Sequence, residues 1–111
     1  KSINKQAHPR AKNFSIMKVE IQSIRFNPDR KLVDFVNKKI EKISAIDDGL
    51  IKTDVFLKID KPESHENKIV EIRIHSSKGE YFAKKQCDTF EESIYLSVQA
   101  LRKQVLKQKG R

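Results

Sequence analysis

The sequence predicts an α+β fold, a two-layer β-α-β-β-β-α sandwich with a four-stranded mixed sheet and both helices on one face. Two patterns predict it. Four short segments alternate apolar and polar residues with the period of a strand, and two longer segments repeat apolar residues with the period of a helix. The chain has 111 residues, so it can bury one modest core and has little room for a second domain.

The first sixteen residues are expected to form a flexible basic leader. They contain four basic side chains and no acidic one, and their apolar residues follow neither period. They also lack the apolar stretch of a secretory signal. We therefore expect residues 1–16 to be a leader of upstream or vector origin, and residues 17–111 to form the single functional domain, starting at Met17.

The first strand is predicted at residues 18–24, where Val19 and Ile21 share one side. Asn27-Pro28 then suits a helix cap followed by proline at the first helical position. The helix should run to about residue 45, before the Asp-Asp-Gly sequence at 47–49. Its buried stripe is expected to consist of Leu32, Val33, Val36, Ile40 and Ile43.

Three further strands are predicted at residues 50–60, 68–75 and 80–86, with a polar loop at 61–66 and a hairpin connection at 76–79. The outward side of residues 50–60 is polar apart from Phe56, which indicates that only one face of the sheet is covered. The expected inward side chains are Ile51, Thr53, Val55, Leu57, Ile59, Val70, Ile72 and Ile74.

The last helix is expected to begin at Asp88, because Glu91 three residues later completes a capping-box pattern. A helix between the first two strands implies a right-handed crossover, so these strands should be parallel neighbours. The short later connections should make the other strands antiparallel. The buried stripe of the last helix is expected to be Phe90, Ile94, Val98, Leu101 and Val105.

The charge distribution indicates a polyanionic partner. The chain has 24 Lys and Arg against 15 Asp and Glu, a formal net charge of +9. Residues 93–111 contain five basic side chains and no acidic one, whereas residues 47–92 contain eight basic and eleven acidic side chains. A basic surface should therefore come from the two ends of the chain. No membrane binding is expected, since no apolar run could span a bilayer and no apolar face is left over.

Catalytic and metal-binding patterns are absent from the sequence. The three glycines are isolated, the three histidines are scattered, and the single Cys87 excludes an internal disulfide. Cys87 is best interpreted as a small, partly buried residue at a strand end. We expect a protein that is not an enzyme and has no cofactor, no metal and no small-molecule substrate.

The outward faces of the two helices are the predicted binding surface. Lysines of the first helix gather on one side, and Asp34 and Glu41 lie off that side. A helix face that served solubility alone would mix both signs of charge. The predicted RNA-binding residues are Lys31, Lys38, Lys39, Lys42, Arg102, Lys103, Lys107, Lys109 and Arg111.

Residues 17–111 resemble the short form of the ribosome hibernation promoting factors, also called ribosome-associated inhibitors or ribosomal subunit interface proteins. The element order carries this resemblance together with local runs of sequence. Those runs are Phe35-Val36-Asn37-Lys38-Lys39-Ile40-Glu41-Lys42-Ile43, Asp54-Val55-Phe56-Leu57-Lys58, Asn67-Lys68-Ile69-Val70-Glu71-Ile72, Asp88-Thr89-Phe90-Glu91-Glu92-Ser93-Ile94 and Leu101-Arg102-Lys103-Gln104-Val105-Leu106-Lys107.

The resemblance implies a cytoplasmic bacterial protein that binds the 30S subunit of the 70S ribosome through 16S ribosomal RNA in the decoding channel. It would block messenger RNA and A- and P-site transfer RNA during stress or stationary phase, and would be monomeric off the ribosome. The basic positions that match are Lys39, Lys42, Lys103 and Lys107, whereas Ala45 and Ala100 stand where relatives often have a basic residue. Without a second domain, the chain alone is not expected to pair two ribosomes.

Two alternatives remain at this point. The first is a general module for double-stranded or structured RNA, because the fold of a double-stranded-RNA-binding domain is similar to the last five elements. Against it, acids rather than lysines precede the last helix. The second is a protein-interaction scaffold that uses the open sheet face through Phe56, Arg73 and His75.

Overall fold

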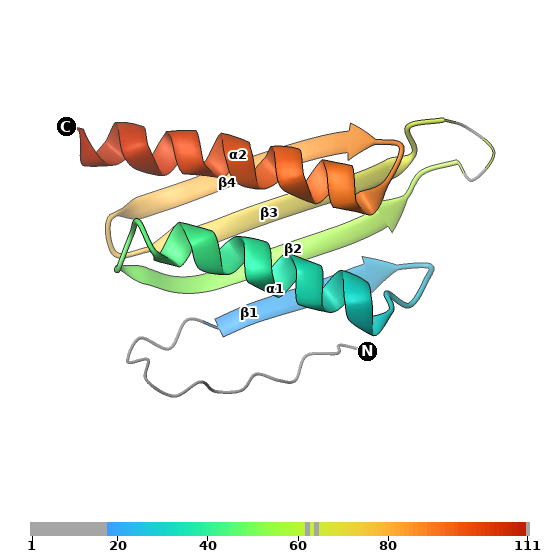
Figure 1. The fold of residues 1–111 in the computed structure, drawn as a ribbon, viewed down its shortest axis with the longest axis horizontal. Coiled ribbons are helices and arrows are strands. Elements are labelled where there is room, and N and C mark those ends of the chain that lie inside the picture. The colour runs from blue at the N-terminus through green and yellow to red at the C-terminus, as the bar shows by residue number, and fades with distance from the viewer. Residues whose placement is uncertain (1–17, 62, 64, 111) are drawn as a thin grey trace.

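Two helices lie side by side on one face of a four-stranded sheet (Figure 1). The computed structural model describes residues 18–61, 63 and 65–110. The predicted leader at 1–16, the start at Met17 and the site residue Arg111 lie outside these residues. The elements are β1 (Lys18–Ile24), α1 (Arg30–Ser44), β2 (Leu50–Ile59), β3 (Lys68–Ser76), β4 (Gly79–Cys87) and α2 (Phe90–Lys109). The predicted fold class and element order are confirmed.

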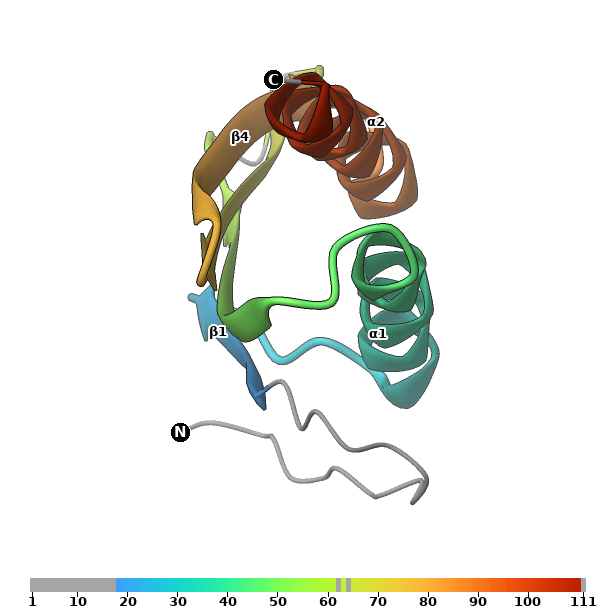
Figure 2. The same cartoon turned by 90° about the vertical axis from the view of Figure 1, so that its left-hand side faces the viewer.

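The strand order in the sheet is β1-β2-β3-β4. The crossover through α1 makes β1 and β2 parallel, with Ile21 opposite Val55. The later connections make β2, β3 and β4 antiparallel, with Val55 opposite Ile72 and Ile72 opposite Ala83. Figure 2 shows the sheet as one layer and both helices as the other, so no element of the described residues covers the second face of the sheet.

The core lies between the two layers and follows the predicted helical stripes. Buried side chains of α1 and α2 meet the inward side of the sheet, where Val55, Leu57 and Ile72 are fully buried. Ser93 is buried among them without an unsatisfied hydroxyl, because its Oγ donates to the Lys68 carbonyl at 2.8 Å. The helical core residues are Leu32, Val36, Ile40, Ile43, Phe90, Ile94, Val98, Leu101 and Val105, and Val33 packs against them.

The start of β2 differs from the prediction. Leu50 pairs with Ser76 while Lys52 pairs with His75, so Ile51 is an extra residue in the ladder. Such a bulge reverses the alternation locally. As a result Ile51 is 57% exposed, and Leu50 takes the buried place. The prediction of an inward Ile51 was therefore wrong, and the inward pattern begins at Thr53.

Both helices begin one or two residues later than predicted. The cap of α1 is Asp29, whose Oδ1 accepts from the Leu32 amide at 2.9 Å, so Pro28 precedes the cap. The cap of α2 is Thr89, whose Oγ1 accepts from the Glu92 amide at 3.1 Å. Several neighbouring residues in each segment can cap a helix, and the path of the chain decides which one does.

Side chains of α2 form hydrogen bonds to the backbone at the outer edge of β4 and in the turn before it. The Gln104 amide accepts from the Phe82 N–H at 3.1 Å and donates to the Phe82 carbonyl at 2.7 Å, as an adjoining strand would. Gln108 donates to the Lys78 carbonyl at 3.1 Å. These bonds tie α2 to the edge of the sheet and occupy the backbone groups that Phe82 would otherwise offer to another strand.

Candidate nucleic-acid interface

Eight of the nine predicted binding residues are in the described part of the chain, and all lie on the two helices. Seven are exposed, and Lys39 is half-buried. Lys39 was expected on the outward face with the others, so its partial burial corrects that prediction. The exposed residues are Lys31, Lys38, Lys42, Arg102, Lys103, Lys107 and Lys109.

Two contacts identify the sides of α1 and α2 that face each other. Lys39 Nζ lies 5.6 Å from the centre of the Tyr95 ring, and Lys109 Nζ donates to the Ile46 carbonyl at 2.9 Å. Residues seven apart lie on nearly the same line of a helix. Arg102 is seven residues from both Tyr95 and Lys109, so it belongs to the same line. We call the residues along this boundary, Phe35, Lys39, Lys42, Tyr95, Arg102 and Lys109, the helix seam.

The exposed lysines of α1 lean toward α2. Lys42 is one turn beyond Lys39, and Lys38 and Lys31 lie next to this side on the helix surface. Asp34 and Glu41 fall on the opposite side of the exposed face by the same geometry. The cations of α1 are therefore directed toward the seam and its acids away from it.

The exposed face of α2 is cationic beyond its first turn. Lys103 and Lys107 are one turn apart and point away from the sheet, opposite Leu101. The acids of α2 are Glu91 and Glu92, which lie in the first turn, where negative charge suits the helix N-terminus. Residues 93–110 contain no acid. An extended anion could thus cross the middle of α2 without meeting a carboxylate of that helix.

The open sheet face has a different character, since two of its lysines are paired with carboxylates. Lys52 lies 3.7 Å from Glu20 and 3.5 Å from Asp54, and Lys84 lies 3.8 Å from Glu71. In the described ranges, none of the eight helix cations forms an ion pair with a carboxylate. Unneutralised positive charge is therefore concentrated on the helix side of the molecule, where it would attract a polyanion.

Lys39 and Lys109 also have structural contacts. The Lys39 ammonium lies between two rings, 5.3 Å from the centre of Phe35 and 5.6 Å from that of Tyr95, a placement that attracts a cation to the ring faces. Lys109 satisfies the Ile46 carbonyl just after α1. Both residues join the helices, so their replacement would alter packing as well as charge.

The residues of the scaffold alternative contact other side chains of the open sheet face. The Arg73 guanidinium lies 4.8 Å above the centre of the Phe82 ring. The His75 ring lies 3.6 Å from Asp54 and 3.1 Å from Glu80. Phe56 is half-buried. Arg73 and His75 therefore have partners within the sheet itself.

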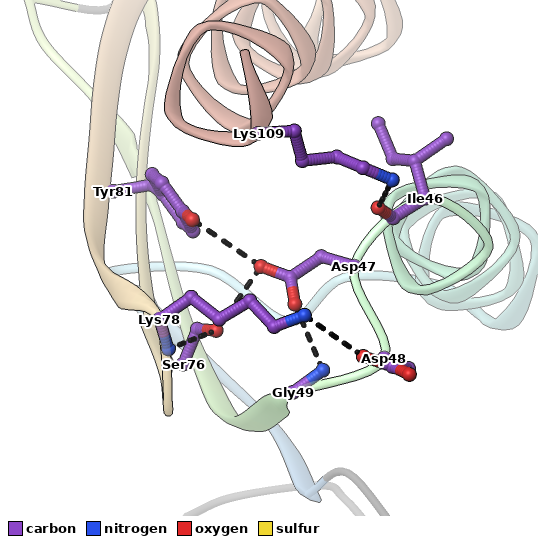
Figure 3. A network of polar contacts seen from close by, with 8 residues as sticks. All are labelled: Ile46, Asp47, Asp48, Gly49, Ser76, Lys78, Tyr81 and Lys109. Carbon is purple, nitrogen blue, oxygen red and sulfur yellow. Dashed lines mark hydrogen bonds and ion pairs between the residues drawn. The ribbon is translucent and has the colours of Figure 1, made fainter. Parts of the chain in front are cut away.

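The buried carboxylate of Asp47 joins the loop after α1 to the β3–β4 hairpin (Figure 3). The sequence pattern did not reveal this role. Asp47 is 3% exposed and accepts from the Gly49 amide at 2.8 Å, the Ser76 hydroxyl at 3.0 Å and the Tyr81 hydroxyl at 3.3 Å. Burial raises the pKa of Tyr81, and the Asp47 carboxylate adds to that shift. At the surface, the Lys78 hydrogen bond at 3.1 Å lowers the pKa of Asp48.

Replacing Asp47 with alanine is expected to lower the free energy of unfolding by about 1–3 kcal/mol, because three donors around a buried site lose their acceptor. Urea unfolding followed by circular dichroism measures this. Asp48→Ala is the matched control, since it removes the adjacent carboxylate, which is exposed, and should leave the unfolding midpoint nearly unchanged. Equal effects of the two changes would contradict the structural role of Asp47.

Other kinds of site do not emerge from the described residues. Within residues 18–61, 63 and 65–110, no three His, Cys, Asp or Glu side chains gather as a metal site requires. No helix in this part of the chain is both long and apolar enough to cross a membrane. Cys87 is a buried free cysteine at the end of β4. The helix cations are thus the strongest candidate site.

Fold and surface together define a small two-layer α+β domain with a concentration of unpaired cations on its helices. The chain belongs to the Sigma 54 modulation protein / S30EA ribosomal protein family, whose model matches residues 19–111. This membership confirms the family resemblance seen in the sequence.

Two solved structures share this fold. A ribosomal subunit interface protein from Coxiella burnetii superposes with a TM-score of 0.76 at 19% identity, over 86% of this chain and 100% of its own. The N-terminal domain of Thermus thermophilus Protein Y superposes with a TM-score of 0.69 at 19% identity, over 85% of this chain and 96% of its own. A comparison with curated proteins gave no match.

Proposed function

We propose that this protein is a ribosome hibernation factor that binds small-subunit ribosomal RNA in the decoding channel and prevents messenger and transfer RNA from binding there. Membership of a ribosomal protein family supports the partner, as does the fold shared with a ribosomal subunit interface protein. In this proposal residues 17–111 act as one ribosome-binding domain, cytoplasmic and monomeric off the ribosome, during starvation or stationary phase.

The observation that carries the proposal is the contrast between the two faces of the molecule. On the open sheet face Lys52 and Lys84 are paired with carboxylates, whereas the exposed lysines of α1 and α2 are directed at solvent without an ion pair in the described residues. A rigid surface of this kind can follow RNA phosphates by shape. Blocking a channel in this way needs no catalytic group, because occupancy itself excludes the competing RNAs.

The binding should depend strongly on salt. If about six lysine and arginine side chains neutralise phosphates, the affinity should fall by about a thousandfold between 50 and 200 mM salt, by analogy with duplex DNA. A binding mode that relied on the open sheet face, where cations and carboxylates are mixed, would show a much weaker dependence on salt.

The test is co-sedimentation of the protein with purified 70S ribosomes at two salt concentrations, with initiator transfer RNA and messenger RNA as competitors. Salt-sensitive binding of one copy per ribosome, displaced by those competitors, would support the proposal. Saturation well above one copy without displacement would instead identify a general RNA-binding module. An absence of binding even at low salt would refute the ribosome as partner.

A further inference from the structure

An exposed aromatic ring lies at the seam between the two cationic helices. The Tyr95 side chain is 48% exposed, and the core of α2 is already filled by residues on its opposite side. Among the aromatic residues of 18–61, 63 and 65–110, Tyr95 and Phe82 are the exposed ones. Phe82 is on the sheet face, so Tyr95 is the exposed ring of the helix face. Core packing alone does not explain a half-exposed tyrosine at this position.

The surroundings of this ring are cationic. The Lys39 ammonium lies 5.6 Å from the ring centre, and Lys42 and Arg102 flank the same seam. The Gln99 amide donates to the Tyr95 hydroxyl at 3.4 Å, which helps to hold the ring in place. A ring fixed by neighbours and surrounded by positive charge offers an apolar face next to phosphate-binding groups.

We propose that Tyr95 is a stacking platform for an unpaired nucleobase of the RNA that the helix face binds. Every base has a π-face, so stacking on an aromatic ring adds affinity with little dependence on sequence. A base in a regular duplex already stacks on both sides, so the occupant must be a nucleotide of a loop, bulge or single strand. The inference rests on the proposed function, and it adds a contact that charge does not provide.

The charges around Tyr95 also indicate the path that the RNA backbone should follow across the helices. Glu91 and Glu92 lie one turn before Tyr95 and would repel phosphates. Arg102 and Lys103 lie about two turns after it and would attract them. The sugar-phosphate backbone on either side of the stacked base should therefore run over the C-terminal half of α2 and toward Lys42 of α1.

The test compares Tyr95→Ala and Tyr95→Phe with wild type in ribosome co-sedimentation, and in binding to a short oligouridylate. Tyr95→Ala should weaken both by about 5- to 150-fold, the range for loss of one stacked base. Tyr95→Phe should bind nearly as wild type, because the ring is retained. The dependence of affinity on salt should not change, since no charge is removed.

Phe82→Ala provides the matched control. Phe82 is similarly exposed, at 40%, and also lies beneath a cation, Arg73, but on the open sheet face. Its loss should leave RNA binding unchanged. Circular dichroism melting of each variant shows whether an altered affinity reflects a folded protein. If Tyr95→Ala is unstable, Tyr95→Leu takes its place, because it keeps an apolar side chain without a ring and should show the same loss of affinity.

The outcomes separate this inference from the proposed function. If Tyr95→Ala binds as wild type while lysine replacements on the helices abolish binding, the stacking platform is refuted and the ribosome proposal stands. Equal losses for Tyr95→Phe and Tyr95→Ala would also refute stacking, since the hydroxyl would then be the contact. If the wild-type protein does not bind ribosomes, the proposed function fails. Binding of wild type and the Tyr95 variants to oligouridylate then tests the stacking platform by itself. Failure of wild type to bind oligouridylate in that case would overturn the inference.

Discussion

Replacing Lys38, Lys42, Lys103 and Lys107 with alanine is expected to weaken ribosome binding by about a thousandfold or more near 0.1 M salt. Each phosphate contact contributes about 0.9 to the slope of log affinity against log salt, so the four changes should reduce that slope by about 3.6. The fold should persist, because all four side chains are exposed and form no ion pair in the described residues. Co-sedimentation over a salt series measures both quantities.

The matched control for this variant removes the same number of charges from the other face. Replacing Lys18, Lys52, Lys58 and Lys84 with alanine also lowers the formal net charge from +9 by four. Those lysines project from the outward side of β1, β2 and β4, and Lys52 and Lys84 are already paired with carboxylates. Binding should remain close to that of wild type. Equal losses for the two variants would show that net charge, and not the helix face, governs binding.

Leu101→Ala is expected to lower the free energy of unfolding by about 2–5 kcal/mol, the cost of leaving a cavity at a buried leucine. Leu101 is fully buried in the middle of α2. Small domains have a total stability of about 5–15 kcal/mol, so this single change removes a large fraction of it. Urea unfolding followed by the helical circular dichroism signal gives the value.

Leu106→Ala makes the same chemical change on the same helix at a side chain that is 45% exposed. It should cost less than about 1 kcal/mol, because a partly solvated leucine leaves no closed cavity. If Leu106→Ala destabilised the protein as much as Leu101→Ala, the assigned buried side of α2 would be wrong. A folded Leu106→Ala protein should also retain ribosome binding, which separates stability from function.

Much of the fold could be predicted because it follows from local periodicity. The stripe from Phe90 to Val105 repeats at helical spacing, and every member of it is buried in α2. The helix between β1 and β2 required a parallel pair, and the short β3–β4 connection required an antiparallel one. The site was predicted at the level of a surface, since lysines on exposed helix faces can be located from helical geometry alone.

Features that join distant parts of the chain could not be predicted. Asp47 acquires its role from Ser76 and Tyr81, which no local pattern places beside it. The exposure of Ile51 depends on the register between β2 and β3, and the alternation of a single strand carries no information about a bulge in its pairing.

The amino-acid sequence alone determined the element order, the buried stripes and the accumulation of positive charge on the helices, because these properties depend on spacing along one segment. Only the tertiary structure decided how the cations are used. It placed Lys39 between Phe35 and Tyr95, joined Lys109 to Ile46, and left Tyr95 half-exposed at the seam. Those outcomes depend on the packing of α1 against α2, and side-chain contacts between two helices are set by their relative placement in space.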